Sequence, residues 1–158
     1  MTPITSPLQL KYYFVSELNV QANRSFDPKQ GVTLGMDDVE MECHAKCTDE
    51  TARMWEVSLR MFHQGKEKGN TPYFFKIEMV GFFAVLESYS PEKDEWLVKT
   101  NASSVLYSTA REVLRTTMAN GPFMPLLLPT ASFYTQETKD ALNKIKADKK
   151  AELKAKEE

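Results

Sequence analysis

Residues 73–86 constrain the fold more than any other part of the chain, because both alternating sets of their side chains are apolar. One set is Phe75, Ile77, Met79, Phe83 and Val85, and the other is Phe74, Val80, Phe82, Ala84 and Leu86. Alternation with period two is typical of a β-strand, and a strand that is apolar on both faces needs a covering layer on each side. In a chain of 158 residues, we expect a second copy of the chain to supply one of these layers.

Three further segments alternate and predict strands at residues 8–22, 39–47 and 55–61. The apolar set of the first is Leu8, Leu10, Tyr12, Phe14, Leu18, Val20 and Ala22, which predicts a strand with one buried face. Because this strand is longer than usual, we expect a bulge near Ser16. Asp49-Glu50 and the glycine-containing residues 64–72 predict turns, so the last three strands should be hairpin neighbours.

After the polar residues 87–95 the apolar positions change to a helical spacing. They are Leu106, Ala110, Val113, Leu114 and Met118, behind the candidate N-caps Asn101, Ser103 and Ser104. Residues 120–122 (NGP) predict the helix end, through a residue that tolerates the left-handed conformation and a proline. A second helix is predicted from about Ser132 or Thr135, with Phe133, Leu142 and Ile145 as apolar positions.

Four strands followed by two helices predict an α+β fold with a four-stranded antiparallel sheet. We expect a flexible N-terminus at residues 1–7, a single domain at residues 8–147 and a charged, disordered tail at residues 148–158.

The charge distribution argues against nucleic-acid binding. Residues 139–158 hold seven lysines and five acids, and the formal charge of the whole chain is −2, so residues 1–138 carry a net charge of −4. An acidic body lacks the clustered lysine and arginine that phosphate contacts need. The apolar runs are shorter than the roughly 20 residues of a membrane span, and the opening residues lack the features of a signal peptide. We therefore expect a cytoplasmic protein.

Side chains suited to catalysis are scarce, so we expect a protein that is not an enzyme and needs no cofactor. His44 and His63 are the histidines, and both are expected to face solvent among polar neighbours. An acidic cluster in residues 90–96 (SPEKDEW) is expected to be a solvated loop; its members are Glu92, Asp94 and Glu95.

Cys43 and Cys47 are the cysteines of the chain. Four residues apart on a strand, they lie about 13 Å from each other, which is too far for a disulfide or for sharing one zinc ion. We therefore expect two half-buried thiols and no metal site.

Residues 104–133 carry a specific resemblance. They contain an aromatic residue followed by Ala-Arg-Glu (Tyr107, then 110–112), a Gly-x-Phe turn (121–123), a Leu-x-Leu segment (126–128) and a helix start with Ala131-Ser132-Phe133. These motifs resemble the protein-export chaperones called SecB. Weaker matches in the same order are Trp-Glu-Val-x-Leu at residues 55–59 and Gly-Phe-Phe at 81–83, so the likeness spans residues 8–145.

The resemblance implies a homotetramer, built as a dimer of dimers with long helices between sheets. It also implies an ATP-independent holdase whose clients are unfolded preproteins or other nascent chains. We expect clients in apolar grooves bordered by the sheet edge, residues 87–100 and the second helix. The expected peptide-binding residues are Trp96, Tyr134, Phe133, Phe26 and Tyr89. A chain with nine phenylalanines and eight methionines has the adaptable side chains that such binding needs.

SecB proteins dock the translocase ATPase SecA through acidic residues on the outer face of the sheet. Glu17 matches one of these positions, whereas Gln21 and Lys76 replace the other acids. A chaperone that serves another partner, such as a toxin–antitoxin pair, is therefore an alternative. A second alternative is a hotdog-type thioesterase, which shares the topology and size but would lack a catalytic carboxylate at residues 101–107.

Overall fold

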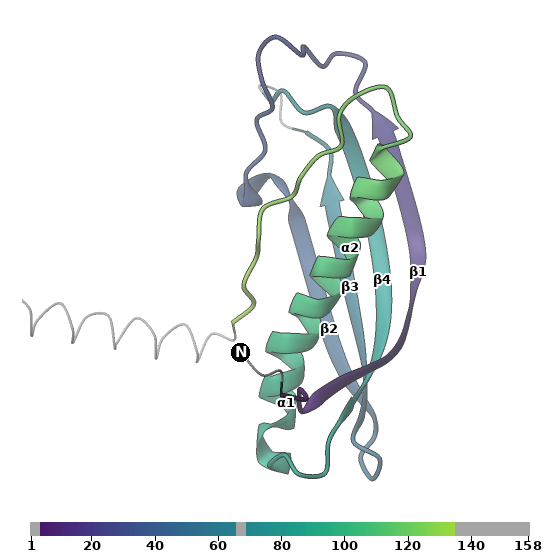
Figure 1. Ribbon diagram of the computed structural model, residues 1–158, viewed down its shortest axis with the longest axis vertical. Coiled ribbons are helices and arrows are strands. Elements are labelled where there is room, and N and C mark those ends of the chain that lie inside the picture. The colour runs from purple at the N-terminus through teal and green to yellow at the C-terminus, as the bar shows by residue number, and fades with distance from the viewer. Residues whose placement is uncertain (1–3, 66–68, 135–158) are drawn as a thin grey trace, which may run out of the picture.

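The protein is described by a computed structural model over residues 4–65 and 69–134. It contains one four-stranded antiparallel sheet with a long helix across one face (Figure 1). The strands are β1 (Leu8–Ala22), β2 (Glu40–Asp49), β3 (Met54–His63) and β4 (Tyr73–Val85). Their order in the sheet is β1-β4-β3-β2, so β1 and β2 are the edge strands. The predicted hairpins β2–β3 and β3–β4 are confirmed.

Strand β1 does not have the single buried face that its alternation predicts. The expected bulge is present between Val15 and Glu17, but a second one lies between Leu10 and Tyr12. Each bulge adds a residue and exchanges the two faces. Tyr12 consequently lies on the outer face, where its ring stacks on Phe82 at a centroid distance of 4.4 Å.

Strand β4 carries apolar side chains on both faces, as predicted, but its outer face also holds Lys76 and Glu78, and only the other face is covered within the chain. Its helix-facing set is buried and comprises Tyr73, Phe75, Ile77, Met79, Phe83 and Val85. The opposite set, Phe74 to Ala84 in alternation, is half-buried. The main core therefore lies between β3, β4 and the helix, where its buried members include Val57, Leu59, Leu106, Ala110 and Leu114.

The helical region begins about ten residues earlier than predicted. It consists of the 3-10 turn η2 (Pro91–Lys93), α1 (Asp94–Leu97), the π turn η3 (Val98–Ala102) and α2 (Ser103–Met118). The predicted N-caps were wrong, because Asn101, Ser103 and Ser104 lie inside this continuous helical run. The Ser103 and Ser104 hydroxyls instead donate to the carbonyls of Lys99 and Thr100, each at 2.9 Å.

The predicted helix end at residues 120–122 is confirmed, but its mechanism differs. Neither Asn120 nor Gly121 adopts a positive φ. A Cβ on Gly121 would lie 2.5 Å from the Tyr73 hydroxyl, so glycine is required there by the close approach of that side chain.

Residues 122–134 run in an extended conformation beside α2 (Figure 1). Leu126 and Leu128 are buried against the core, and the Tyr107 hydroxyl donates to the Pro129 carbonyl at 2.6 Å. Residues 132–134 are not helical, and the rest of the predicted second helix lies outside the described residues, as does the tail at 148–158. No helix within the described ranges is long and apolar enough to cross a membrane.

Candidate functional site

A pocket of about 250 Å³ lies at the edge of the sheet, between β2 and the helical region. Two of its residues come from β2, two from the start of the long helix and two from the extended segment; they are Cys43, Ala45, Lys99, Ser103, Phe133 and Tyr134. We call this pocket the edge groove. Because β2 is an edge strand, one row of its backbone amide and carbonyl groups is not paired within the sheet.

The wall on the helix side is built by the π turn. Ser103 donates its hydroxyl proton to the Lys99 carbonyl, and its oxygen lies 2.9 Å from Cys43 Sγ. Since the serine proton is already used, the thiol is the donor in the second bond. Burial raises the pKa of the Cys43 thiol, and the bond to Ser103 offsets only part of that effect. The Cys43 thiol is therefore a neutral, half-buried part of the groove wall. Its half-burial agrees with the prediction made from the sequence.

The wall on the C-terminal side is formed by the aromatic residues of the extended segment. Phe133 packs edge-on against Tyr107, with ring centroids 5.7 Å apart, which orients it along the helix. Tyr134 remains exposed at its surface. The groove is thus apolar on two sides and polar at Lys99, a composition typical of sites that take an apolar side chain from an extended peptide.

An ion pair fixes the helical region to the far end of the β2–β3 hairpin. The Arg53 guanidinium donates to both carboxylate oxygens of Asp94, with Nε to Oδ2 at 2.7 Å. It also donates to the carbonyls of Leu86 and Tyr89, each at 2.9 Å. Arg53 adopts a φ of +49°, so the turn is held in a sparsely populated conformation by these four bonds.

This ion pair corrects the prediction of a solvated acidic loop. Asp94 is buried, and α1 begins at this residue. Glu92 and Glu95 are exposed, as expected. The solvated loop was predicted because the acids of this segment are interspersed with Lys93 and follow Ser-Pro, a composition typical of exposed loops.

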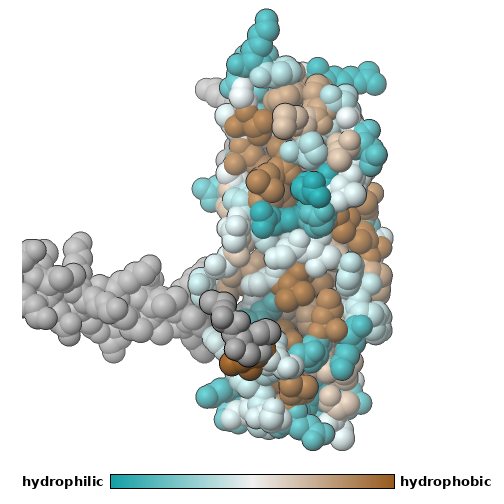
Figure 2. All heavy atoms as spheres, viewed as in Figure 1, coloured by the Kyte–Doolittle hydropathy of each residue, from teal (hydrophilic) through white to brown (hydrophobic). Residues whose placement is uncertain are grey.

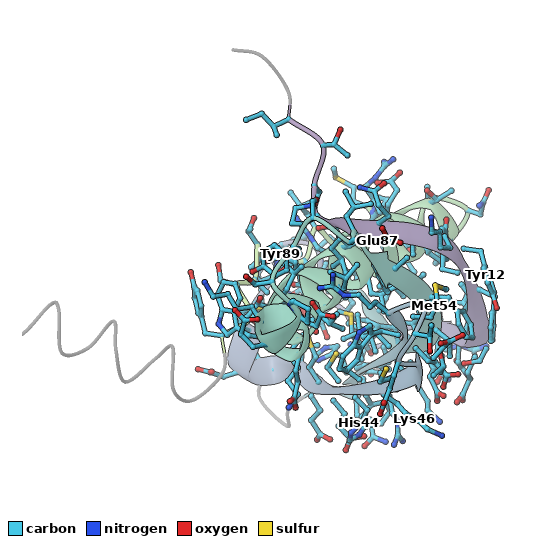
Figure 3. All side chains as sticks on the ribbon, turned by 90° about the horizontal axis from the view of Figure 1, so that it is seen from below. Tyr12, His44, Lys46, Met54, Glu87 and Tyr89 are labelled. Carbon is cyan, nitrogen blue, oxygen red and sulfur yellow. The ribbon has the colours of Figure 1, made fainter. Side chains whose placement is uncertain are left out.

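The predicted peptide-binding residues do not all lie at one site. Phe133 and Tyr134 line the edge groove, whereas Trp96 is exposed about one turn away on α1. Phe26 packs against Phe123, at a centroid distance of 5.1 Å. Tyr89 lies in the loop that Arg53 holds (Figure 3). Neither Phe26 nor Tyr89 is among the lining residues of the groove.

Other predicted positions lie outside the groove. His44 is exposed on the outer face of β2, as predicted (Figure 3). The prediction for His63 was wrong: its side chain is only 2% exposed, and its ring nitrogens contact the Asp38 carbonyl at 2.7 Å and the Thr71 hydroxyl at 3.1 Å. Glu17 lies on the outer face and forms an ion pair with Lys76 at 2.7 Å.

Sequence reasoning did not assign Cys43, Ala45, Lys99 and Ser103 to the site. They belong to segments about 60 residues apart, and no local pattern brings those segments together. The alternation of β2 places Cys43 and Ala45 on one face of the strand. This pattern was the available indication in the sequence that the two residues belong to one site. Among the described residues, no group of three or more histidine, cysteine or acidic side chains is arranged to hold a metal ion.

Comparisons with known proteins agree with this architecture. A family model described as "Preprotein translocase subunit SecB" matches residues 5–140. No curated protein matches significantly. Among solved structures, the chain is similar to the Mycobacterium tuberculosis Rv1957 SecB-like chaperone in complex with a ChAD peptide from the Rv1956 HigA1 antitoxin. The two chains are 18% identical with a TM-score of 0.61, over 81% of this chain and 93% of the other.

A second solved structure, a protein of unknown function from Streptococcus agalactiae, is 11% identical with a TM-score of 0.43, over 75% of this chain and 95% of that one. This likeness is too low to carry an argument. At 18% identity, the mycobacterial structure supports the fold of the sheet and helix.

Proposed function

This chain belongs to the SecB family of chaperones, and from that premise we propose that it holds unfolded polypeptides without using ATP. The edge groove is the observation that carries the proposal. It joins an unpaired strand edge to an apolar pocket of about 250 Å³ at the surface. A client can therefore pair its backbone with β2 and insert an apolar side chain between Phe133 and Ala45, independently of the rest of its sequence.

The lining of the groove favours binding over catalysis. None of its six residues is a carboxylate or a histidine, so it offers no general base near neutral pH. This composition gives no support to the thioesterase alternative. We place the chaperone in the cytoplasm, where clients are met before export.

We further propose that the chain assembles as a dimer of dimers. The face that carries α2 shows hydrophobic side chains over residues 122–130 and along the β1 edge (Figure 2). Its exposed apolar residues are Leu10, Tyr13, Leu18, Val105, Met124 and Leu127, of which Met124 and Leu127 are 86% and 76% exposed. Apolar exposure of this extent is typical of a surface that is covered by another chain. Multi-angle light scattering that gives a monomer of about 18 kDa at micromolar concentration contradicts this assembly.

Delivery to the translocase has weaker support than holding. Glu17, the acid that matches a SecA-docking position, is already paired with Lys76. A charge that is neutralised within the chain attracts a basic partner less. This ion pair favours a second candidate function, in which the chaperone serves a non-export partner such as an antitoxin. The mycobacterial structural neighbour was solved with an antitoxin peptide.

The holding proposal is tested by suppression of aggregation. A chemically denatured, slowly folding protein is diluted into buffer without nucleotide, and light scattering is followed with and without the chaperone. Tyr134→Ala and Trp96→Ala should weaken suppression while the oligomer remains intact. Tyr12→Ala is the matched control, because Tyr12 is equally aromatic and 56% exposed but lies on the opposite face of the sheet.

If Tyr134→Ala and Trp96→Ala both suppress aggregation as well as the unaltered protein, clients do not use this groove. If the unaltered protein fails to suppress aggregation of any substrate, the holdase function itself is refuted.

A further inference from the structure

A second groove crosses the face of the sheet that points away from α2. It consists of two adjoining pockets of about 380 and 110 Å³, which share the side chain of Phe62. The larger is lined by Asn19, Gln21, Phe62, His63, Gln64, Phe74, Phe75 and Lys76, and the smaller by Glu40, Glu42, Arg60 and Phe62. We call the two together the outer groove.

The strand register places the outer groove along one row of the sheet. Asn19 is opposite Lys76, Lys76 is opposite Phe62, and Phe62 is opposite Glu40. Residues opposite each other on neighbouring strands project from the same face. The row therefore runs from Asn19 on β1, across Lys76 on β4 and Phe62 on β3, to Glu40 on β2. The next row on the same face places Gln21 opposite Phe74, and we call Phe62 and Phe74 the aromatic centre of the groove.

The backbone beside the aromatic centre packs closely against it. Gly65 adopts a φ of +83°, and a Cβ at this position would lie only 2.6 Å from Cε1 of Phe74. The glycine thus allows the β3–β4 connection to contact the Phe74 ring closely. Phe62 and Phe74 remain half-buried, which leaves apolar ring surface in the groove.

The charge along the groove is uneven. At the β4 end, Lys76 is already paired with Glu17 at 2.7 Å. At the β2 end, Glu42 has only a long contact of 3.5 Å with Arg60, and Glu40 forms no ion pair with any residue in the described ranges. Both acids are exposed. An excess of negative charge therefore lies about one strand spacing, ~5 Å, from the aromatic centre.

We propose that the outer groove binds an extended segment of a partner protein in which a large apolar residue and a lysine or arginine are separated by one residue. In an extended chain, side chains two positions apart share a face and lie about 6.6–7 Å apart. This spacing places the apolar side chain on Phe62 and Phe74 while the basic side chain reaches Glu40 and Glu42. The amides of Asn19, Gln21 and Gln64 can bond the backbone of the segment.

This site is separate from the edge groove, whose Cys43 and Ala45 project from the other face of β2. It shares Gln21 and Lys76 with the face expected to dock SecA, but its negative charge is on β2 and not on β1 and β4. A client and this partner can therefore be bound at the same time. The proposal does not depend on the holdase function.

Fluorescence anisotropy with short labelled peptides tests the proposal at low salt, where surface charges are least screened. The probe is Gly-Ser-Phe-Ser-Lys-Ser-Gly, compared with the same peptide carrying glutamate in place of lysine. We expect the lysine peptide to bind at least tenfold more tightly. The double variant Glu40→Gln with Glu42→Gln should weaken its binding about threefold to tenfold and reduce the salt dependence.

Two further variants sharpen the test. The pair Glu50→Gln with Glu87→Gln removes the same charge from exposed positions outside the groove and should leave the affinity unchanged. Phe62→Thr keeps a side chain suited to a strand but removes the ring, and should weaken binding about tenfold. Circular dichroism confirms that each variant is folded.

Equal affinity for the lysine and glutamate peptides overturns the proposal. An equal loss of affinity in the two double variants, Glu40→Gln with Glu42→Gln and Glu50→Gln with Glu87→Gln, overturns it as well. A change in oligomeric state caused by Glu40→Gln with Glu42→Gln also overturns it, because the face is then a contact between copies of the chain. Aggregation suppression is measured on the same variants. We expect it to be unchanged, which separates this site from the edge groove.

Discussion

Tyr73 controls the position of the segment that forms one wall of the edge groove, and its removal gives a prediction whose size follows from the structure. The side chain is 1% exposed. Its hydroxyl donates to the Phe123 carbonyl at 2.7 Å, with the Met118 carbonyl at 3.1 Å sharing the proton, and accepts from the Phe123 amide at 2.9 Å. The variant Tyr73→Phe therefore removes two hydrogen bonds while keeping the ring.

A typical hydrogen bond contributes about 0.5–1.5 kcal/mol net, and a buried group left without a partner costs about 1–3 kcal/mol. Two lost bonds thus lower the free energy of unfolding by about 2 kcal/mol. For a chain of this size, that corresponds to a fall in Tm of about 4–8 °C. Hydrogen exchange should also accelerate at residues 119–128 more than in β3, because the loss is local.

Urea denaturation at fixed protein concentration and amide hydrogen exchange measure these effects. Tyr12→Phe is the control, since Tyr12 is exposed and stacks on Phe82 through its ring, which the substitution keeps. A loss for Tyr73→Phe no greater than that of Tyr12→Phe would refute the reasoning that this hydroxyl positions residues 122–134.

Three further predictions follow from the charges, the thiols and the C-terminal residues. The double change Gln21→Glu with Lys76→Glu should strengthen SecA binding by about 1 kcal/mol, since exposed charges contribute about 0.2–1 kcal/mol each; calorimetry at low salt measures it, and no gain contradicts the placement of the docking face. Because burial raises the pKa of the Cys43 thiol, its reactive thiolate is less populated, and iodoacetamide should label Cys43 more slowly than Cys47 at neutral pH; equal rates argue against the buried thiol. Truncation after Lys149 should leave Tm nearly unchanged, because the residues beyond it offer no apolar stripe to bury, and a large fall in calorimetry shows that they pack.

The sheet was predictable because apolar and polar residues alternate along its strands. The apolar residues on both faces of β4 in particular indicated that this strand is central in the sheet. The limits of this signal appear in β1. A bulge changes the face of every following residue without changing the composition, so Tyr12 and Phe14 have the same sequence pattern as Leu8 but project from the opposite face. Only the expected length of a strand indicated the bulge near Ser16, and nothing indicated the one at Lys11.

The start of the helical region was hidden for a different reason. The π turn at Val98–Ala102 interrupts the 3.6-residue period, so Leu97 and Val98 do not continue the apolar spacing of Leu106 and Ala110. Asp94 carried no sequence sign of burial, since its partner Arg53 lies in a hairpin turn 41 residues earlier. For the site, the aromatic residues Phe133 and Tyr134 were identified through the family resemblance, whereas the contribution of β2 required the assembled sheet.

The π turn also sets a rule for how this part of the gene can change. Each residue of an α-helix turns the next by about 100°, and a wide turn accommodates one additional residue in the same rise. The wide turn thus holds an additional residue while Asp94 points at Arg53 and Leu106 and Ala110 point at the sheet. Loss of a single codon within residues 98–102 would therefore convert the wide turn into an ordinary α-helical turn and leave both the ion pair and the core in place. Loss of a single codon within the regular turns of α2 has no such outlet, and it would rotate α1 by about 100° relative to the rest of α2.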